Sequence, residues 1–380
     1  MTDARNTPGR DMVDWPFLLQ RNAADIQTPA LVIDLDAFER NVRKMADHCR
    51  ENGISLRAHA KTHKCAEIAR RQIAAGAVGQ CCASLDEAEM LVAAGIGSIL
   101  VTSPLVTEAA IQRLMKLNAT APGLMAVADN HQAAQRLAQA ALGAGQTLKL
   151  LVDIDIGHHR TGIAPGKAAC ALAAAIAKSP NLEFAGIQGY AGHLMHLADR
   201  GERQTRSAGA LEQLRLTRDQ LRGMGLAPRI ITGGGTGSFD IDPAEQILTE
   251  LQAGSYVFMD RQYNEVWTDA PPFETSLFVL TRVVSANHPG MATTDAGLKA
   301  FSTDADAPVI SFGPGTAYSF FGDEYGCITL ADSVAAQPGD AVACMVPHCD
   351  PTVNLYGHYL VVRGGELVDR WPIASGKYRA

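Results

Sequence analysis

The sequence lacks several features that mark particular classes of protein. Its lysines and arginines form no run and its formal net charge is −7, which argues against a protein that binds nucleic acid. No stretch reaches the ~18 consecutive apolar residues of a membrane span, and residues 1–21 hold no apolar segment of the secretory type. We therefore expect a cytoplasmic protein without a membrane or nucleic-acid partner.

Cysteine pairs of the metal-binding or redox type are also missing. Eight cysteines lie scattered through 380 residues with no C-x-x-C spacing, so we expect reduced thiols rather than a disulfide framework. Aromatic residues make up only 6% of the chain, whereas 47% is hydrophobic and 35 residues are glycine. This composition suits helices packed closely on strands with glycine-rich loops, and the length predicts two or three domains.

Short β-branched runs alternate with alanine-rich helical stretches from Thr28 to Asp269. Eight predicted strands, each coupled to a helix, indicate an α/β fold, a (β/α)8 TIM-type barrel, with a doubly wound sheet as the alternative. An earlier strand over 30–35 leads into a helix over 36–52. The barrel strands are expected at 55–60, 78–82, 98–102, 124–128, 148–153, 185–190, 229–232 and 255–258, and further helices at 64–75, 84–94, 107–117, 130–143, 166–178 and 202–223.

The segments on either side of this region have a different residue pattern. Residues 1–27 are expected to form an N-terminal arm before a barrel domain over 28–269. Ala-Pro-Pro at 270–272 is a linker signal, and strand-like runs separated by Gly, Pro and Asp follow it. We predict a second, all-β domain over 270–380, with a tight hairpin at the Gly-Gly of residues 364–365.

Lys61 is the first candidate for chemistry, because active sites of such barrels lie at the C-terminal ends of the strands. It follows the first predicted barrel strand in the segment Arg57-Ala-His59-Ala-Lys61-Thr-His63-Lys64. A lysine buried at a strand end can lose its proton and form a Schiff base. A solvated basic loop is the alternative interpretation.

A glycine-rich segment, Thr232-Gly-Gly-Gly-Thr-Gly-Ser238, follows the seventh predicted strand. Its successive N–H groups, including that of Gly235, and the hydroxyls of Thr236 and Ser238 can surround an anion. Barrels favour phosphate sites in the loops after strands seven and eight, and residues 252–256 offer more donors at the eighth. The segment predicts a phosphate site that is not a P-loop, with a plain turn as the alternative.

Histidines supply the remaining candidates. His348 and Asp350 would share one face of an extended strand in the second domain, where they suit a divalent ion such as Zn²⁺ or Mn²⁺. A structural hydrogen bond between them is the alternative. Candidate acids, bases or anion contacts follow the fifth and sixth predicted strands, unless they only satisfy their own loops: His158, His159, Arg160, His193 and His196.

Six segments occur together and in a fixed order: Arg-x-His-x-Lys-x-His-Lys, Cys-Cys with a following Glu-Ala-Glu, Gly-Gly-Gly-Thr-Gly-Ser, Leu-Gln-Ala-Gly-Ser-Tyr-x-Phe-Met-Asp, Asp-Ala-Gly-Leu-Lys and His-x-Asp-Pro-Thr. From about Thr28 to the C-terminus the chain resembles the D-threonine aldolase and D-3-hydroxyaspartate aldolase family. These are fold-type III pyridoxal-phosphate enzymes, related more distantly to D-serine dehydratase and alanine racemase. The resemblance implies a barrel of the alanine racemase type.

The resemblance also implies roles for individual residues. Lys61 corresponds to the family's Schiff-base lysine, and His196 to its proposed catalytic base. The positions implied to contact the cofactor, besides Lys61, are Arg160, Tyr190, Gly235, Thr236, Gly254, Ser255 and Tyr256. His348 and Asp350 correspond to the metal ligands, for Mn²⁺, Mg²⁺, Co²⁺ or Zn²⁺.

This chain departs from the family pattern at four positions. Ala83 stands where relatives have Gln, Ala191 where they have His or Gln, and Tyr325 where they have His, while His193 is additional. The cofactor chemistry is compatible with these changes. The identity of the substrate side chain is what they leave open.

The implied reaction is the metal-dependent cleavage of a D-3-hydroxy amino acid to glycine and an aldehyde by a carbon–carbon lyase. The alternative is β-elimination of the D-serine dehydratase type, which gives a keto acid and ammonia. Two other interpretations are a pyridoxal-phosphate carrier protein, although such carriers lack a second domain, and a phosphosugar barrel enzyme without a cofactor. We also expect a homodimer, because in fold-type III relatives the β domain of one subunit covers the barrel of the other.

Overall fold

The computed structural model describes residues 26–121, 123–267 and 270–374, so the predicted arm lies almost wholly outside the described residues. Contacts divide the chain into two units. One unit ends its first segment at Ala37 and continues over Thr275–Trp371, and the other consists of Phe38–Glu274 and the residues from Pro372. In the described part of the chain, no helix has the length and apolar character needed to cross a membrane.

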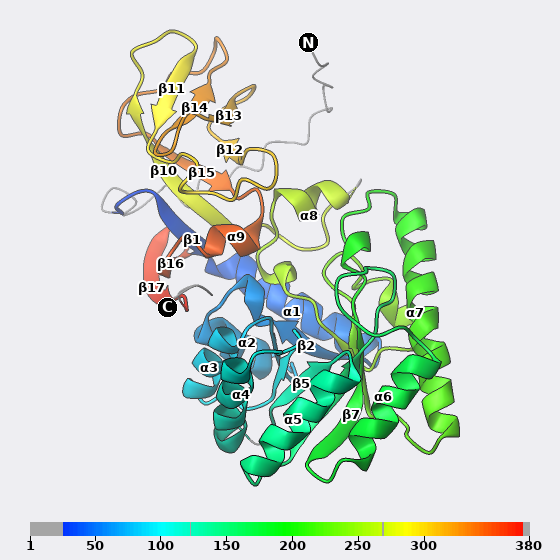
Figure 1. Ribbon diagram of the computed structural model, residues 1–380. Helices are drawn as coiled ribbons and strands as arrows, with labels where there is room; N and C mark the ends of the chain where they lie inside the picture. Colours follow the sequence, from blue (N-terminus) through cyan, green and yellow to red (C-terminus); the bar gives the residue numbers. More distant parts are fainter. Residues whose placement is uncertain (1–25, 122, 268–269, 375–380) are drawn as a thin grey trace. The chain divides into compact units, whose positions relative to one another are not determined.

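The unit that begins at Phe38 is a closed barrel of eight parallel strands, which confirms the predicted (β/α)8 fold. Figure 1 shows the helices α2 to α7 outside these strands, coloured from blue through cyan to green. The strands are β2 (Ser55–His59), β3 (Gly79–Cys82), β4 (Ile99–Val101), β5 (Met125–Ala128), β6 (Leu148–Asp153), β7 (Leu182–Gly189), β8 (Ile230–Gly233) and β9 (Glu250–Leu251). The helices are α1 (Leu35–Glu51), α2 (Ala66–Ala74), α3 (Leu85–Ala93), α4 (Glu108–Thr120), α5 (His131–Gly143), α6 (Lys167–Lys178), α7 (Arg200–Gly223) and α8 (Arg261–Val266).

Local sequence explains why the helices begin just after the strand ends. At the start of four of them a side chain accepts a hydrogen bond from the first turn and satisfies a backbone N–H that the helix leaves unpaired: Ser84, Thr107, Asn130 and Asp199. Inside the barrel, residues of neighbouring strands pack into one buried cluster: Cys81, Leu100, Met125, Val127, Leu151 and Ala185. The short connections hold polar residues at the C-terminal rim.

The barrel is closed by a buried ion pair between its first and last strands. Arg57 on β2 makes two parallel hydrogen bonds to Glu250 on β9, each of 2.8 Å. The side chains are only 4% and 9% exposed, and the guanidinium also donates to Ser98 Oγ at 3.0 Å. The motif residue Arg57 therefore belongs to the wall of the barrel and not to the cavity described below.

The predicted eighth strand is wrong. The eighth strand is β9, and the predicted residues 255–258 begin with the 3₁₀ turn η6 (Ser255–Val257). β9 pairs with β2 and β8 over two residues only, after which the chain turns inward. A short apolar run such as Tyr-Val-Phe suits a buried turn as well as a strand, and here the ring of Tyr256 and its neighbours are fully buried.

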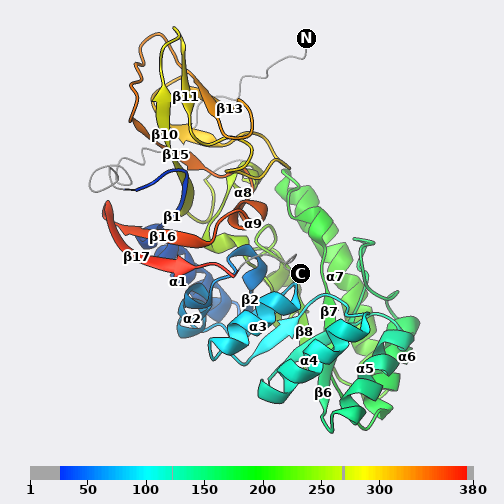
Figure 2. The same cartoon turned by 60° about the vertical axis from the view of Figure 1, so that its left-hand side comes forward.

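The second unit is a nine-stranded sheet, as the predicted β domain requires, and it also takes in β1 (Ala30–Asp34). β1 pairs antiparallel with β10 and parallel with β16, as the blue strand beside the red one in Figure 2 shows. The strand predicted over 30–35 therefore belongs to this sheet and not to the barrel region. All five of its residues are buried, so it needs a neighbour on each side, but local sequence does not reveal which ones.

The remaining strands follow the prediction with two additions. The sheet contains β10 (Leu277–Ser285), β11 (Met291–Thr294), β12 (Val309–Ser311), β13 (Ala317–Phe320), β14 (Gly326–Thr329), β15 (Ala341–Met345), β16 (His358–Arg363) and β17 (Glu366–Pro372). Sequence analysis missed β12 and β13, which are short and flanked by glycine and proline. The predicted hairpin joins β16 to β17, where Gly364 and Gly365 both have positive φ, as a type I′ turn requires.

Candidate active site

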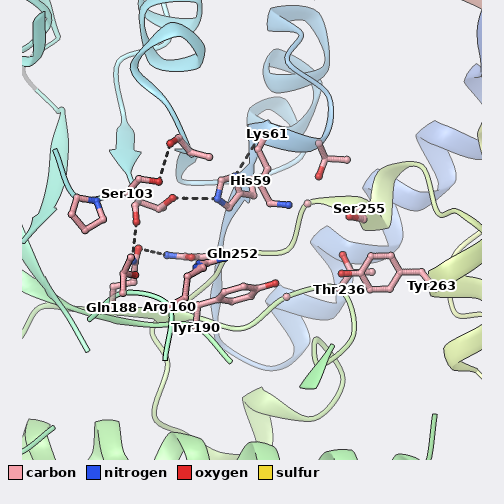
Figure 3. A pocket seen from close by; sticks show the side chains of 17 residues that line it. His59, Lys61, Ser103, Arg160, Gln188, Tyr190, Thr236, Gln252, Ser255 and Tyr263 are labelled. Atoms are coloured by element: carbon pink, nitrogen blue, oxygen red, sulfur yellow. Dashed lines mark hydrogen bonds between the residues drawn. The ribbon is translucent and has the colours of Figure 1, made fainter. Parts of the chain in front are cut away.

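A cavity of about 370 Å³ opens where the barrel strands end. Figure 3 shows side chains from several strand ends pointing into it. The cavity brings together seven of the residues that the sequence nominated: Lys61, Arg160, Tyr190, Gly235, Thr236, Gly254 and Ser255. Tyr256 and His196 are not among its lining residues, and His348 and Asp350 belong to the sheet unit.

Lys61 stands on the turn η3 (Ala60–Thr62), which His59 fixes from the preceding position. The Nδ1 atom of His59 accepts a hydrogen bond from the Lys61 N–H at 3.4 Å. Its Nε2 atom lies 3.3 Å from the Thr102 hydroxyl, which itself donates to the Cys82 carbonyl at 3.1 Å. Because that hydroxyl has one hydrogen, His59 must donate to it. The bonds therefore select the neutral Nε2–H form of His59 and tie the lysine turn to two further strand ends.

This chain of bonds predicts that His59 controls how readily Lys61 reacts. We expect His59→Phe to slow the attachment of pyridoxal phosphate to Lys61 about tenfold, since one or two hydrogen bonds worth ~1 kcal/mol each are lost. The rate is measured by the growth of cofactor absorbance and by trapping with borohydride. His59→Asn keeps an acceptor for the Lys61 N–H and should lose less. An unchanged attachment rate in His59→Phe would contradict the assignment.

The glycine-rich loop and the end of β9 form a nest of donors next to Lys61. The Tyr256 N–H donates to Thr236 Oγ1 at 3.0 Å, which leaves the Thr236 hydroxyl hydrogen for another acceptor. A Cβ on Gly254 would come within 2.7 Å of Thr62 Oγ1 and 2.9 Å of the His59 carbonyl, so only glycine lets the chain pass this closely. The ring of Tyr256 is buried and its hydroxyl accepts a bond from Gln72 at 3.1 Å. Tyr256 can therefore serve the site only through its backbone.

Arg160 supplies a positive charge on the opposite side of the nest. Its guanidinium lies over the ring of Tyr190, with 5.4 Å to the centroid, a cation–π contact. Among the residues that the structure describes, it makes no hydrogen bond or ion pair. The group is thus available to a polar or anionic ligand.

A network of side-chain amides crosses the floor of the cavity, and sequence analysis did not foresee it. Gln188 on β7 donates to Asp153 Oδ1 at 2.9 Å and to the Thr102 carbonyl at 3.3 Å. Gln252, after β9, donates to Gln188 Oε1 at 3.1 Å. Burial raises the pKa of Asp153, although its bonds to Gln188 and to the Thr161 hydroxyl oppose this. The network keeps the floor polar and rigid.

Neither of the two histidines after β7 lines the cavity. His196 is exposed and its ring packs 4.6 Å from that of Tyr263, which lines the cavity. His193 stacks on His158 at 5.5 Å. Partial burial and nearby cationic groups lower the pKa of both, so the pair is neutral near pH 7. Tyr263 lines the cavity, although no motif or spacing predicts this.

The arrangement of His348 and Asp350 differs from the predicted one. His348 precedes the helix α9 (Cys349–Val353) and Asp350 lies in its first turn, so the two do not alternate along an extended strand. Pro351 explains this, because it has no N–H for a strand ladder and is tolerated in a first helical turn. In the described part of the chain, no three His, Cys, Asp or Glu residues form a group that could hold a metal ion.

Two protein ligands nevertheless fit a hard divalent cation that keeps other ligands from water or substrate. The Nδ1 atom of His348 lies 2.7 Å from Asp304 Oδ2, and a carboxylate on one ring nitrogen is what orients a metal-binding histidine. This leaves Nε2 for a metal. The Asp350 carboxylate accepts a bond from the Cys349 thiol at 3.4 Å.

The cavity also fits pyridoxal phosphate by the chemistry of its donors. The glycine-rich loop offers backbone N–H groups and the Thr236 hydroxyl to a phosphate, and Gly254 leaves room beside Lys61. Lys61 supplies the amine that an aldehyde requires. Arg160 and Tyr190 supply a cation and a ring face for a flat heteroaromatic group.

Comparison with known proteins matches both units. Residues 33–262 match the family described as alanine racemase, N-terminal domain, and residues 276–362 match a serine dehydratase domain. A 3-hydroxy-D-aspartate aldolase from Paracoccus denitrificans is 37% identical over 369 residues, 95% of each chain. A D-threonine aldolase from Arthrobacter is 40% identical over 360 residues, 93% of each chain.

A solved structure of an aldolase is similar over nearly the whole chain. The D-threonine aldolase from Filomicrobium marinum superposes with a TM-score of 0.89 at 40% identity, covering 93% of this chain and 96% of that one. Dehydratases are more distant. A D-threo-3-hydroxyaspartate dehydratase from Delftia is 30% identical over 294 residues, 75% of each chain.

Proposed function

Because the chain belongs to the family of D-threonine and 3-hydroxy-D-aspartate aldolases, we propose that it cleaves the Cα–Cβ bond of D-3-hydroxy amino acids. The products would be glycine and an aldehyde. The family implies pyridoxal phosphate as cofactor. The observation that carries the proposal is that Lys61, the glycine-rich loop, Arg160 and Tyr190 all line one cavity.

Pyridoxal phosphate, when bound, withdraws the electron pair that the broken Cα–Cβ bond leaves on Cα. The chain's own residues hold it and the substrate in place. Lys61 would carry it, and the loop at Gly235 and Thr236 together with the turn at Gly254, Ser255 and Tyr256 would surround its phosphate, with the Thr236 hydroxyl as one donor. Arg160 and Tyr190 would hold the ring, since their guanidinium and ring lie together at the cavity wall.

His196 is the proposed general base of the cleavage. It would accept the proton of the substrate's β-hydroxyl at a ring nitrogen. Its contact with Tyr263, a lining residue, supports a position at the cavity rim. His348 and Asp350 are the proposed ligands of a divalent cation, which would supply charge that lowers the pKa of the same hydroxyl.

Product analysis tests the function. Purified enzyme with pyridoxal phosphate and Mn²⁺ should release glycine from D-threonine or D-3-hydroxyaspartate, and none from the L-isomers. Removal of the metal by chelation should abolish the release while the cofactor absorbance stays. Ammonia and a keto acid in place of glycine would make the enzyme a dehydratase, and full activity in chelator would make His348 and Asp350 structural.

The proposal includes a homodimer in which the sheet unit of one subunit serves the barrel of the other. Lys61 and His348–Asp350 belong to different units of the chain, so a shared site can be tested by complementation. Neither Lys61→Ala nor Asp350→Ala should be active alone. Their mixture, after dissociation and reassociation, should recover about a quarter of wild-type activity, because half the dimers would be mixed and each mixed dimer holds one intact site. Confirmed mixed dimers without activity would exclude sharing.

A further inference from the structure

Asp242, in the turn η5 (Asp242–Glu245), places a buried carboxylate against the glycine-rich loop. It is 2% exposed. Both of its oxygens accept hydrogen bonds from neutral hydroxyls: Ser207 Oγ on α7 donates at 2.5 Å and Ser238 Oγ in the loop at 2.6 Å. In the described residues no lysine or arginine hydrogen-bonds to it.

The loop is built around this carboxylate. A Cβ on Gly234 would come within 2.5 Å of Asp242 Oδ2, and Gly234 has φ of +69°, so the loop leaves β8 in a conformation that presses its backbone against the acid. The Gly235 N–H donates to Ser238 Oγ at 3.3 Å, and the same hydroxyl donates to Asp242. The Asp242 N–H in turn donates to the Ser238 carbonyl at 2.9 Å.

These bonds decide which donors of the loop remain available. Gly235 has its N–H occupied by Ser238, whereas the N–H groups of Thr236 and Gly237 donate no hydrogen bond within the described part of the chain. Successive unoccupied N–H groups of this kind form an anion-binding nest. Ser238, which occupies the Gly235 N–H, is itself hydrogen-bonded to Asp242.

Burial raises the pKa of Asp242 to about 6, with smaller contributions from the carboxylates of Asp240 and Glu245, and the two serine bonds oppose the shift. The folded protein therefore favours the protonated acid, and the contribution of Asp242 to stability falls as the pH rises from about 4 to 6. At neutral pH the ionised carboxylate destabilises the folded state.

We propose that Asp242, acting through Ser238, is a positioning residue of the phosphate site: it holds the glycine-rich loop in the form that leaves Thr236 and Gly237 free to bind the cofactor's phosphate. The inference rests on the proposed function, because it takes pyridoxal phosphate as the ligand. We therefore expect the loss of Asp242 to weaken binding of the cofactor's phosphate group, while binding of its aldehyde and ring is little changed.

The test compares pyridoxal phosphate with pyridoxal, which lacks the phosphate. Apoenzyme is titrated with each, and the ratio of the two dissociation constants gives the phosphate preference. Asp242→Ala should lower this preference about tenfold or more, through weaker binding of pyridoxal phosphate with pyridoxal binding changed less than about threefold. Asp242→Asn, which can accept from one serine and donate to the other, should stay within about threefold of the wild type.

A matched pair of variants covers the case in which Asp242→Ala fails to fold. Ser238→Ala and Ser207→Ala each remove one hydroxyl from Asp242, but only Ser238 connects the acid to the loop. Ser238→Ala should lower the phosphate preference and Ser207→Ala should leave it unchanged, with similar losses in melting temperature. Glu250→Gln is a second control, a buried carboxylate of the barrel wall whose loss should lower the melting temperature only.

The outcomes separate the inference from the function on which it rests. An unchanged preference in Asp242→Ala and Ser238→Ala would overturn the inference and leave the aldolase function intact. An equal loss of phosphate preference in Ser238→Ala and Ser207→Ala would also overturn the inference, because it would show a general effect on the fold. Wild-type apoenzyme that binds neither compound would remove both proposals.

Discussion

Lys61→Ala is expected to lose aldolase activity by about three orders of magnitude or more, a loss of the size seen when a covalent catalytic group is removed. Lys61 is the lysine that lines the cavity, and its turn is held by His59 and faces the glycine-rich loop through Gly254. The variant should still bind pyridoxal phosphate, because the phosphate donors remain, but borohydride should no longer fix the cofactor to the protein.

Mass spectrometry of the reduced wild-type enzyme identifies the lysine. Lys64 is the natural competitor, since it is three residues away and 7% exposed. Its backbone lies in the left-handed region with φ of +47°, and its carbonyl accepts a bond from the Ala374 N–H at 2.8 Å, so it has a structural place outside the cavity. A reduced cofactor found on Lys64, or on Lys61→Ala protein, would contradict the assignment.

Glu250→Ala is expected to lower the free energy of unfolding by about 3–5 kcal/mol, because it leaves the buried charge of Arg57 without its partner. The pair is bidentate and joins the first and last strands of the barrel. The double replacement Arg57→Met with Glu250→Leu should recover most of the loss, since apolar side chains of similar volume can replace a buried ion pair.

An exposed ion pair in the same unit provides the control. Arg40 and Glu274 also form a double hydrogen bond, of 2.7 and 2.8 Å, but their side chains are 53% and 52% exposed. Glu274→Ala should cost ~1 kcal/mol or less. Urea unfolding of the cofactor-free proteins measures the loss of unfolding free energy in Glu250→Ala and in Glu274→Ala. A smaller loss in Glu250→Ala than in Glu274→Ala would contradict the role of the buried pair in closing the barrel.

The sequence predicts elements well where local pattern decides them. β6 occupies the predicted residues 148–153, because an apolar run between polar turns becomes a strand buried on both faces. The eighth strand was misplaced because two residues, Glu250 and Leu251, are too few to form a pattern. β1 was assigned to the wrong region because its partners are about 250 and 330 residues away in sequence.

The residues of the candidate site likewise include some that local sequence predicts and some that it does not. Lys61 and Thr236 could be predicted because they directly follow strands and lie in distinctive motifs. Gln188 and Gln252 could not, since a single glutamine has no spacing signal and these two meet only when β7 and the end of β9 come together. Asp242 could not be recognised for a related reason: its buried hydrogen bonds include one from Ser207, which lies 35 residues earlier on α7.

The central place of β1 has a consequence for how the protein is made. Residues 30–34 are synthesised before the barrel, but both strands that flank them, β10 and β16, are synthesised after it. Until then a largely apolar strand has two open edges, the form in which strands pair with other chains. A fragment that begins after β1 would have the opposite defect, with a gap between β10 and β16. Joining residues 26–37 behind Trp371 by a flexible linker would supply the missing strand from the other end.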